Sequence, residues 1–176
     1  MNFKDILNLY AKYNKHANSE MIRILSTLPA SRLHEDTGNY YKTIAGILNH
    51  SLRATAGSLK RFADGGLLPN LILPVTDSFP QKPMGEAIFT TIEEFTVLRT
   101  KIDDLLIALC SEVSPDDLDT TFSFTGYDKQ QKTLTFGGNL LALHTHETHH
   151  RGGVSSILDS WNVVNDWSSL MRMLFL

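Results

Sequence analysis

Residues 143–153 read Leu-His-Thr-His-Glu-Thr-His-His-Arg-Gly-Gly and hold four of the seven histidines of the chain. Residues that are four apart on an α-helix lie about 40° apart on one face, one turn above the other. His146 and His150 have this spacing, and two imidazoles in that arrangement can bind one metal ion. His144 and His149 lie at roughly 160° and 60° from His146 on the same helical wheel, so they point elsewhere. The stretch therefore predicts a helix that carries two metal ligands.

A third ligand is expected from another helix, because two histidines rarely make a tight site. His50 is the best candidate, since Ala54 and Gly57 lie one and two turns beyond it and leave space inside a bundle. A core histidine held by a hydrogen bond is the alternative, but a preformed histidine pair favours ligation. His34 is expected in a solvated polar loop, and His16 is expected at most to line a pocket.

Three neutral imidazoles leave at least one coordination position open, as in catalytic rather than structural metal sites. A water bound there can have its pKa lowered to about 7, and a substrate thiolate could take the same position. Imidazole ligands suit Zn, Ni, Fe and Cu alike, so the pattern predicts one divalent ion per chain without choosing the metal.

The composition is that of an ordinary globular protein. The chain has 176 residues, of which 42% are hydrophobic and 20% charged, with a net charge of −3. This charge gives no general attraction to nucleic acid. The single cysteine, Cys110, excludes an internal disulfide and fits a packing role in a reducing compartment. The first residues do not resemble a signal peptide, and no apolar run approaches the roughly 20 residues that span a bilayer. We expect a cytoplasmic protein with one domain over residues 1–176.

Hydrophobic periodicity predicts an all-α protein, a four-helix bundle with one long crossover. The long helices are expected over residues 3–28, 40–63, 85–112 and 139–161. The polar connection over 31–39 and the proline-rich crossover over 67–83 are expected to be irregular. Alternating patterns predict a short β-hairpin before the last long helix, with strands over 120–124 and 133–136 and a polar turn over 127–132. Asp166 is expected to cap a short C-terminal helix that ends near Leu174.

With these residues placed, the chain resembles the DinB-like family of small metal-binding four-helix bundles. Three motifs carry the resemblance in the right order: Tyr-Asn-Lys-His-Ala-Asn at 13–18, the segment 41–52 with its Leu-Asn-His, and Thr-His-Glu-Thr-His-His-Arg-Gly at 145–152. Asp166 and Trp167 also resemble its C-terminal segment. His16 stands where the family usually has tryptophan, and Gly153 where it usually has glutamine. Losing that glutamine is expected to widen the site or to remove a polar contact to a ligand.

The resemblance implies a three-histidine metal site, here His50, His146 and His150, and homodimers in many members. Some relatives are metal-dependent thiol transferases or isomerases that use low-molecular-weight thiols, and many have no known activity. We therefore expect an enzyme that acts on a small molecule through a metal-activated thiol or water. A metal-dependent hydrolase and a non-catalytic metal-binding dimer are the alternatives, and neither nucleic acid nor a membrane is expected as a partner.

Residues 146–150 also satisfy His-Glu-x-x-His, the helical zinc motif of metalloproteases, in which the glutamate is the general base. The metzincin extension would need a third histidine at position 156, which is Ser156, and no glutamate follows Glu147 that could serve as a downstream ligand. A peptidase is therefore disfavoured. Glu147 remains a candidate catalytic base, with orientation of a histidine or an exposed helix position as alternatives.

Several polar residues keep two interpretations. We expect Arg151 to be a surface or interface charge, with contact to an anionic substrate as the alternative. Asn14, Asn18 and Asn49 are expected either to hold water or substrate or to make capping or inter-helix hydrogen bonds.

Overall fold

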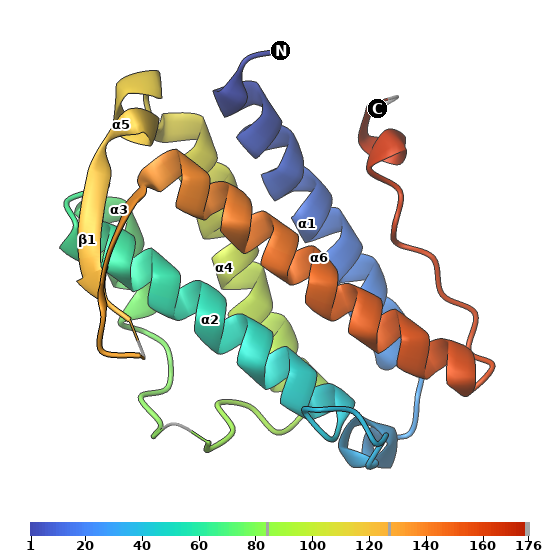
Figure 1. Ribbon diagram of the computed structural model, residues 1–176. Coiled ribbons are helices and arrows are strands. Elements are labelled where there is room, and N and C mark those ends of the chain that lie inside the picture. Colours follow the sequence, from blue (N-terminus) through green and yellow to red (C-terminus); the bar gives the residue numbers. More distant parts are fainter. Residues whose placement is uncertain (84, 127, 175–176) are drawn as a thin grey trace.

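The computed structural model describes residues 1–83, 85–126 and 128–174, and four long helices form its body (Figure 1). Helix α1 packs against α4 and α6, and α2 packs against α6. The predicted four-helix bundle is therefore confirmed. The long helices are α1 (Phe3–Leu25), α2 (Ile44–Asp64), α4 (Ile92–Glu112) and α6 (Phe136–Ser160).

Shorter elements connect these helices. The predicted hairpin is confirmed directly before α6, with β1 antiparallel to β2 and Thr121 opposite Thr135. Residue 127 of its predicted turn lies outside the described residues. The shorter elements are η1 (Ala30–His34), α3 (Pro69–Thr76), α5 (Pro115–Asp119), β1 (Thr121–Thr125), β2 (Gln131–Thr135) and η2 (Leu170–Leu174).

The crossover between α2 and α4 is more regular than predicted, because it contains the helix α3. Pro69 stands at the start of α3, where its missing N–H is no loss because the first N–H groups of a helix have no partner within it. The buried side chain of Ile72 anchors α3 to the core. The prediction of an irregular segment was wrong here because it treated every proline as a helix breaker, whatever its position. The connection before α2 likewise contains η1, which buries Leu33.

Two long helices begin later than predicted, each at a threonine cap. Thr91 Oγ1 accepts a hydrogen bond from Glu94 N at 3.2 Å, and the Glu94 carboxylate accepts one from Thr91 N at 3.3 Å, so α4 starts at Ile92 and not at Gly85. Gly85 has a φ of +92°, which a right-handed helix does not allow. At the start of α2, Thr43 Oγ1 accepts a hydrogen bond from Gly46 N at 2.9 Å.

The C-terminal segment runs back along the bundle beside α1 and α6 (Figure 1). It is tied down by the buried Trp167 and by Tyr13, whose hydroxyl donates to the Ser168 carbonyl at 3.0 Å. Asp166 does not cap a helix as predicted, because its carboxylate accepts from Ser168 N at 3.4 Å and the terminal turn η2 begins only at Leu170.

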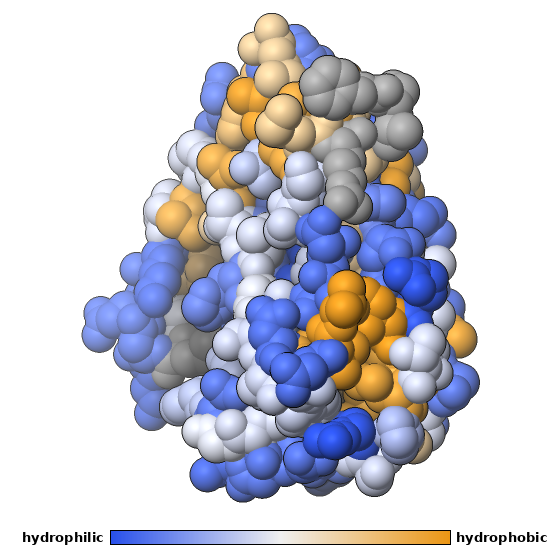
Figure 2. Space-filling model, turned by 90° about the vertical axis from the view of Figure 1, so that its right-hand side faces the viewer, coloured by the Kyte–Doolittle hydropathy of each residue, from blue (hydrophilic) through white to orange (hydrophobic). Residues whose placement is uncertain are grey.

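Figure 2 shows the face that carries this segment, on which hydrophobic patches lie among hydrophilic side chains. Val164, Met171 and Leu174 belong to the segment and are exposed. None of the helices in the described part of the chain combines the length and the apolar character that a membrane span requires.

Candidate metal centre

The three predicted histidines meet between α2 and α6. His50 comes from α2, and His146 and His150 lie one turn apart on α6. His146 Nε2 lies 3.3 Å from His50 Nε2 and 3.0 Å from His150 Nε2. One nitrogen from each ring falls within 4.8 Å of the others. Two nitrogens bound tetrahedrally at about 2.0–2.1 Å from one metal are about 3.4 Å apart, so the spacing of these atoms fits a shared ion.

The rings also have the protonation state that a metal requires. Burial, followed by the neighbouring imidazoles, lowers the pKa of His150 from 6.5 to about 4. Burial likewise lowers the pKa values of His50 and His146 below 6.5. The three imidazoles are therefore neutral at pH 7, and a neutral imidazole has the free electron pair that binds a metal. The residues present fit one divalent metal ion.

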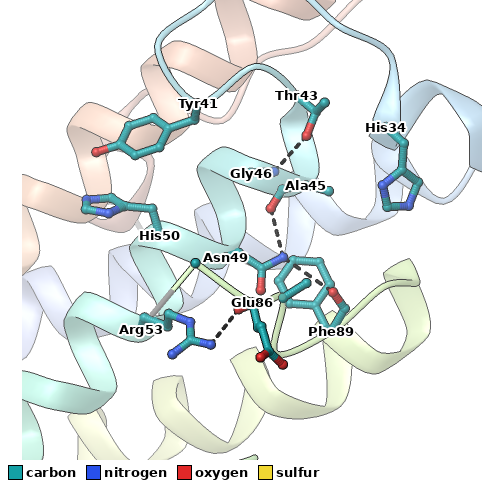
Figure 3. A pocket seen from close by; sticks show the side chains of 12 residues that line it. His34, Tyr41, Thr43, Ala45, Gly46, Asn49, His50, Arg53, Glu86 and Phe89 are labelled. Carbon is teal, nitrogen blue, oxygen red and sulfur yellow. Dashed lines mark hydrogen bonds between the residues drawn. The ribbon is translucent and has the colours of Figure 1, made fainter. Parts of the chain in front are cut away.

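Tyr41, in the loop before α2, lies against two of these histidines. Its ring stacks on the imidazole of His50 with centroids 4.5 Å apart and meets His150 edge-on at 5.5 Å. Figure 3 shows the Tyr41 and His50 rings one above the other. Both residues line a hollow of about 400 Å³. A second hollow, of about 710 Å³, is lined by Tyr41 and His150. The histidine cluster is thus reached from two sides.

The hollow beside His150 includes Gly152 and Gly153. A Cβ atom at Gly153 would meet only Ile47 Cδ1, at 3.8 Å, and one at Gly152 would meet nothing within 4 Å. The space expected from a glycine at position 153 is therefore present on this side of the site.

Glu147 is buried, so the alternative of an exposed helix position is wrong. Its Oε1 atom accepts hydrogen bonds from Ser51 Oγ at 3.0 Å, Thr55 Oγ1 at 2.5 Å and Arg99 Nη1 at 3.0 Å. Burial alone raises the pKa of this carboxyl, but the Arg99 guanidinium and the hydroxyl donors outweigh it and lower the pKa to about 2. Glu147 is thus ionised and held one residue from His146 on the same helix.

Arg151 is also buried, and the prediction of a surface charge is wrong. Its guanidinium donates to Asn18 Oδ1 at 3.2 Å and to Asn14 Oδ1 at 2.5 Å. Asn18 in turn donates to Asp103 Oδ1 at 3.0 Å. The inter-helix interpretation of Asn14 and Asn18 is therefore supported, since both link α1 to α6 and Asn18 also links α1 to α4.

These contacts continue into one buried polar network behind the histidines. Arg99 joins Glu147 of α6 to Asp103 of its own helix, with Arg99 Nη2 2.8 Å from Asp103 Oδ1. Two guanidinium groups, of Arg99 and Arg151, balance the two carboxylates, which lets charged groups remain inside the bundle. The network ties α6 to the other three long helices and so fixes the position of its histidines.

At one end of the network lies His144, which points away from the three clustered histidines as predicted. Its Nδ1 atom is 2.8 Å from Asn14 Nδ2, an amide donor, so the proton of the neutral ring is on Nε2. Burial lowers the pKa of His144 to about 4. Cys110 lies 3.9 Å from this ring, and burial raises the pKa of its thiol to about 12, in keeping with the predicted packing role.

The remaining candidates lie outside the cluster. His34 is exposed and bonds the Thr90 carbonyl at 2.9 Å, and His149 is exposed on α6. Asn49 supports the loop before α4, because its Oδ1 accepts from Ile88 N at 2.8 Å.

Sequence reasoning missed Tyr41, Ser51, Thr55 and the pair Arg99–Asp103. The pair had a weak sequence signal: Arg99 and Asp103 carry opposite charges and lie four residues apart, close to the apolar stripe of their helix.

The chain resembles a known protein family over most of its length. A model of the DinB family matches residues 1–161, a range that contains all three converging histidines. No curated protein and no solved structure matches the chain significantly. Because the family match covers most of the sequence, we conclude that this protein belongs to the DinB family.

Proposed function

We propose that this protein is a metal-dependent enzyme that binds one divalent ion per chain on His50, His146 and His150 and acts on a small molecule. The observation that carries the proposal is the convergence of three histidines: His146 Nε2 lies 3.3 Å from His50 Nε2 and 3.0 Å from His150 Nε2, and hollows open beside them. Three-histidine sites that keep a position free are typical of catalytic rather than structural metals.

The bound ion would supply Lewis acidity to a thiol or a water molecule placed next to a small electrophile. The chain's own residues would provide the environment for this chemistry. Tyr41 covers the His50 and His150 rings and restricts the access of water, while the hollows admit the substrate. The buried network through Glu147 and Arg99 holds α6 in place, so that His146 and His150 need little reorganisation to bind the ion.

Glu147 Oε1 accepts three hydrogen bonds, which favours a role in positioning α6 over the role of a general base. A carboxylate with a pKa of about 2 is also a weak proton acceptor at pH 7. The peptidase alternative therefore gains no support from Glu147.

The first test is the metal content of protein purified without chelator or a histidine tag. We expect about one divalent ion per chain and its loss in His146→Ala and His50→Ala. His149→Ala is the matched control, because this histidine adjoins the site on the same helix but is exposed, and its metal content should equal that of the wild type. An empty wild-type protein that also fails to take up Zn²⁺ or Ni²⁺ would refute the proposal.

The second test separates the thiol-dependent from the water-dependent reaction. The protein is incubated with a chromogenic electrophile, with and without a small thiol. Turnover that requires thiol and stops with chelator indicates a transferase, whereas metal-dependent release without thiol indicates a hydrolase. A metal-loaded protein that is silent in both assays, across a panel of electrophiles, would leave the non-catalytic metal-binding protein as the better reading.

We also propose a homodimer. The exposed apolar side chains of Val164, Met171 and Leu174 along the C-terminal segment support it, because apolar surface that a fold leaves exposed can mark an interface. Light scattering during size-exclusion chromatography would test it, and a monomeric mass at micromolar concentration would contradict it.

A further inference from the structure

Tyr41 is the residue that the two hollows beside the histidines share. It lines the hollow of about 400 Å³ together with His50, and the hollow of about 710 Å³ together with His150. Its ring stacks on the first imidazole and stands edge-on to the second. The ring therefore borders both hollows and lies against two of the three histidines.

An unusual backbone arrangement holds Tyr41 there. Lys42 has a φ of +66°, and the Tyr41 carbonyl accepts a hydrogen bond from Thr43 N at 2.7 Å, which makes a tight three-residue turn. A left-handed conformation of a residue with a side chain costs roughly 1–2 kcal/mol. Such strain tends to persist at ligand-binding sites, where the surrounding structure enforces it.

Helix α2 is shaped to accept this turn. A Cβ atom added at Gly46 would lie 2.1 Å from the Tyr41 carbonyl oxygen, so only glycine lets the turn pack against the first turn of the helix. The turn is further tied by Thr37 N, which donates to the Lys42 carbonyl at 2.7 Å. Four features, at residues 37, 42, 43 and 46, thus place one aromatic ring over two of the proposed metal ligands.

We propose that Tyr41 is a specificity-determining residue whose ring divides the space before the histidines and limits the size of the ligand that reaches the metal. This inference rests on the proposed metal site and adds to it the residue that selects the substrate by size. The ring, and not the hydroxyl, performs the selection.

The test uses protein loaded with Co²⁺, in which a bound thiolate gives a charge-transfer absorption band. Titrations with ethanethiol and with 2-naphthalenethiol give a dissociation constant for each, and the ratio of the two measures size selection. In Tyr41→Ala we expect this ratio to shift in favour of the naphthyl ligand by at least about tenfold, since removal of the ring opens space that the larger ligand can fill. Tyr41→Phe keeps the ring and should retain the wild-type ratio.

Two glycine variants of α2 test the same inference without changing Tyr41. Gly46→Ala displaces the Tyr41 carbonyl and should shift the ratio in the direction of Tyr41→Ala. Gly57→Ala is the matched control, because a Cβ atom there meets nothing within 4 Å, and its ratio should equal that of the wild type. If Gly46→Ala does not fold, the two Tyr41 variants decide the question.

The outcomes separate this inference from the metal site itself. A wild-type protein that takes up no Co²⁺ would overturn the proposed function and the role of Tyr41 with it. Normal Co²⁺ uptake with an unchanged ratio in Tyr41→Ala would overturn the role of Tyr41 alone. An equal shift in Tyr41→Phe would assign selection to the hydroxyl and refute the inference, as would the absence of thiolate binding in every form.

Discussion

Replacing Glu147 by glutamine is expected to destabilise the folded protein, because Glu147 belongs to the buried polar network. Glutamine keeps the shape of the side chain but removes the charge that faces Arg99, whose guanidinium would then have only Asp103 as an ionic partner. The hydroxyls of Ser51 and Thr55 both donate hydrogen bonds to the carboxylate. The amide group of glutamine would place N–H donors next to these hydroxyl donors.

The size of this effect follows from the carboxyl pKa. A decrease from 4.5 in the unfolded chain to about 2 in the folded protein corresponds to about 3 kcal/mol of stability at pH 7. Breaking a buried ion pair by removing one partner typically costs about 3–5 kcal/mol, which agrees. Because the folded pKa is the lower one, this contribution is complete above pH 4.5 and is lost as the pH falls toward 2.

The assay is urea unfolding at pH 7 in the presence of chelator, so that bound metal does not contribute to stability. Glu147→Gln should lower the free energy of unfolding by about 3 kcal/mol. The exposed Glu112→Gln is the control and should change it by no more than about 0.5 kcal/mol. A loss below about 1 kcal/mol in Glu147→Gln would refute the reasoning, because it would mean that the buried carboxylate is not held by its partners.

Three further predictions concern the site and its supports. Gly153→Gln should fill the hollow beside His150 and weaken binding of 2-naphthalenethiol to the Co²⁺-loaded protein several-fold. Unchanged binding would show that the ligand uses the hollow beside His50 instead. The free energy of unfolding of the metal-free protein should fall as the pH drops from 6.5 toward 4, because folded His144 has a pKa of about 4 and the histidine of the unfolded chain takes up a proton first. This pH dependence should weaken in His144→Gln. The same dependence of unfolding free energy on pH in wild type and variant would contradict the low pKa of His144. Thr43→Ala removes the cap of α2 and should cost about 1 kcal/mol in urea unfolding, whereas no loss would mean that water replaces the cap.

Local patterns in the sequence were sufficient to predict the elements of the bundle and the histidine pair on α6. Helical periodicity depends on neighbouring residues, so the four helices and the His146–His150 spacing could be read directly. The predicted starts of α2 at residue 40 and of α4 at residue 85 were wrong, because apolar periodicity continues beyond the first residue of each helix. The threonine caps at Thr91 and Thr43 mark the ends through hydrogen bonds that periodicity does not report.

The surroundings of the histidines were decided by the tertiary structure. Glu147 and Arg151 look like exposed charges in a helix, and only their partners on α1, α2 and α4 make burial possible. Tyr41 lies nine residues before His50 in the sequence, outside the helix, and reaches the site through a tight turn that no local pattern announced. The sequence by itself determined which residues can bind a metal, since that depends on residue type and helical spacing. Only the packing of helices distant in sequence determined what surrounds them, because burial and charge pairing are properties of contacts between elements.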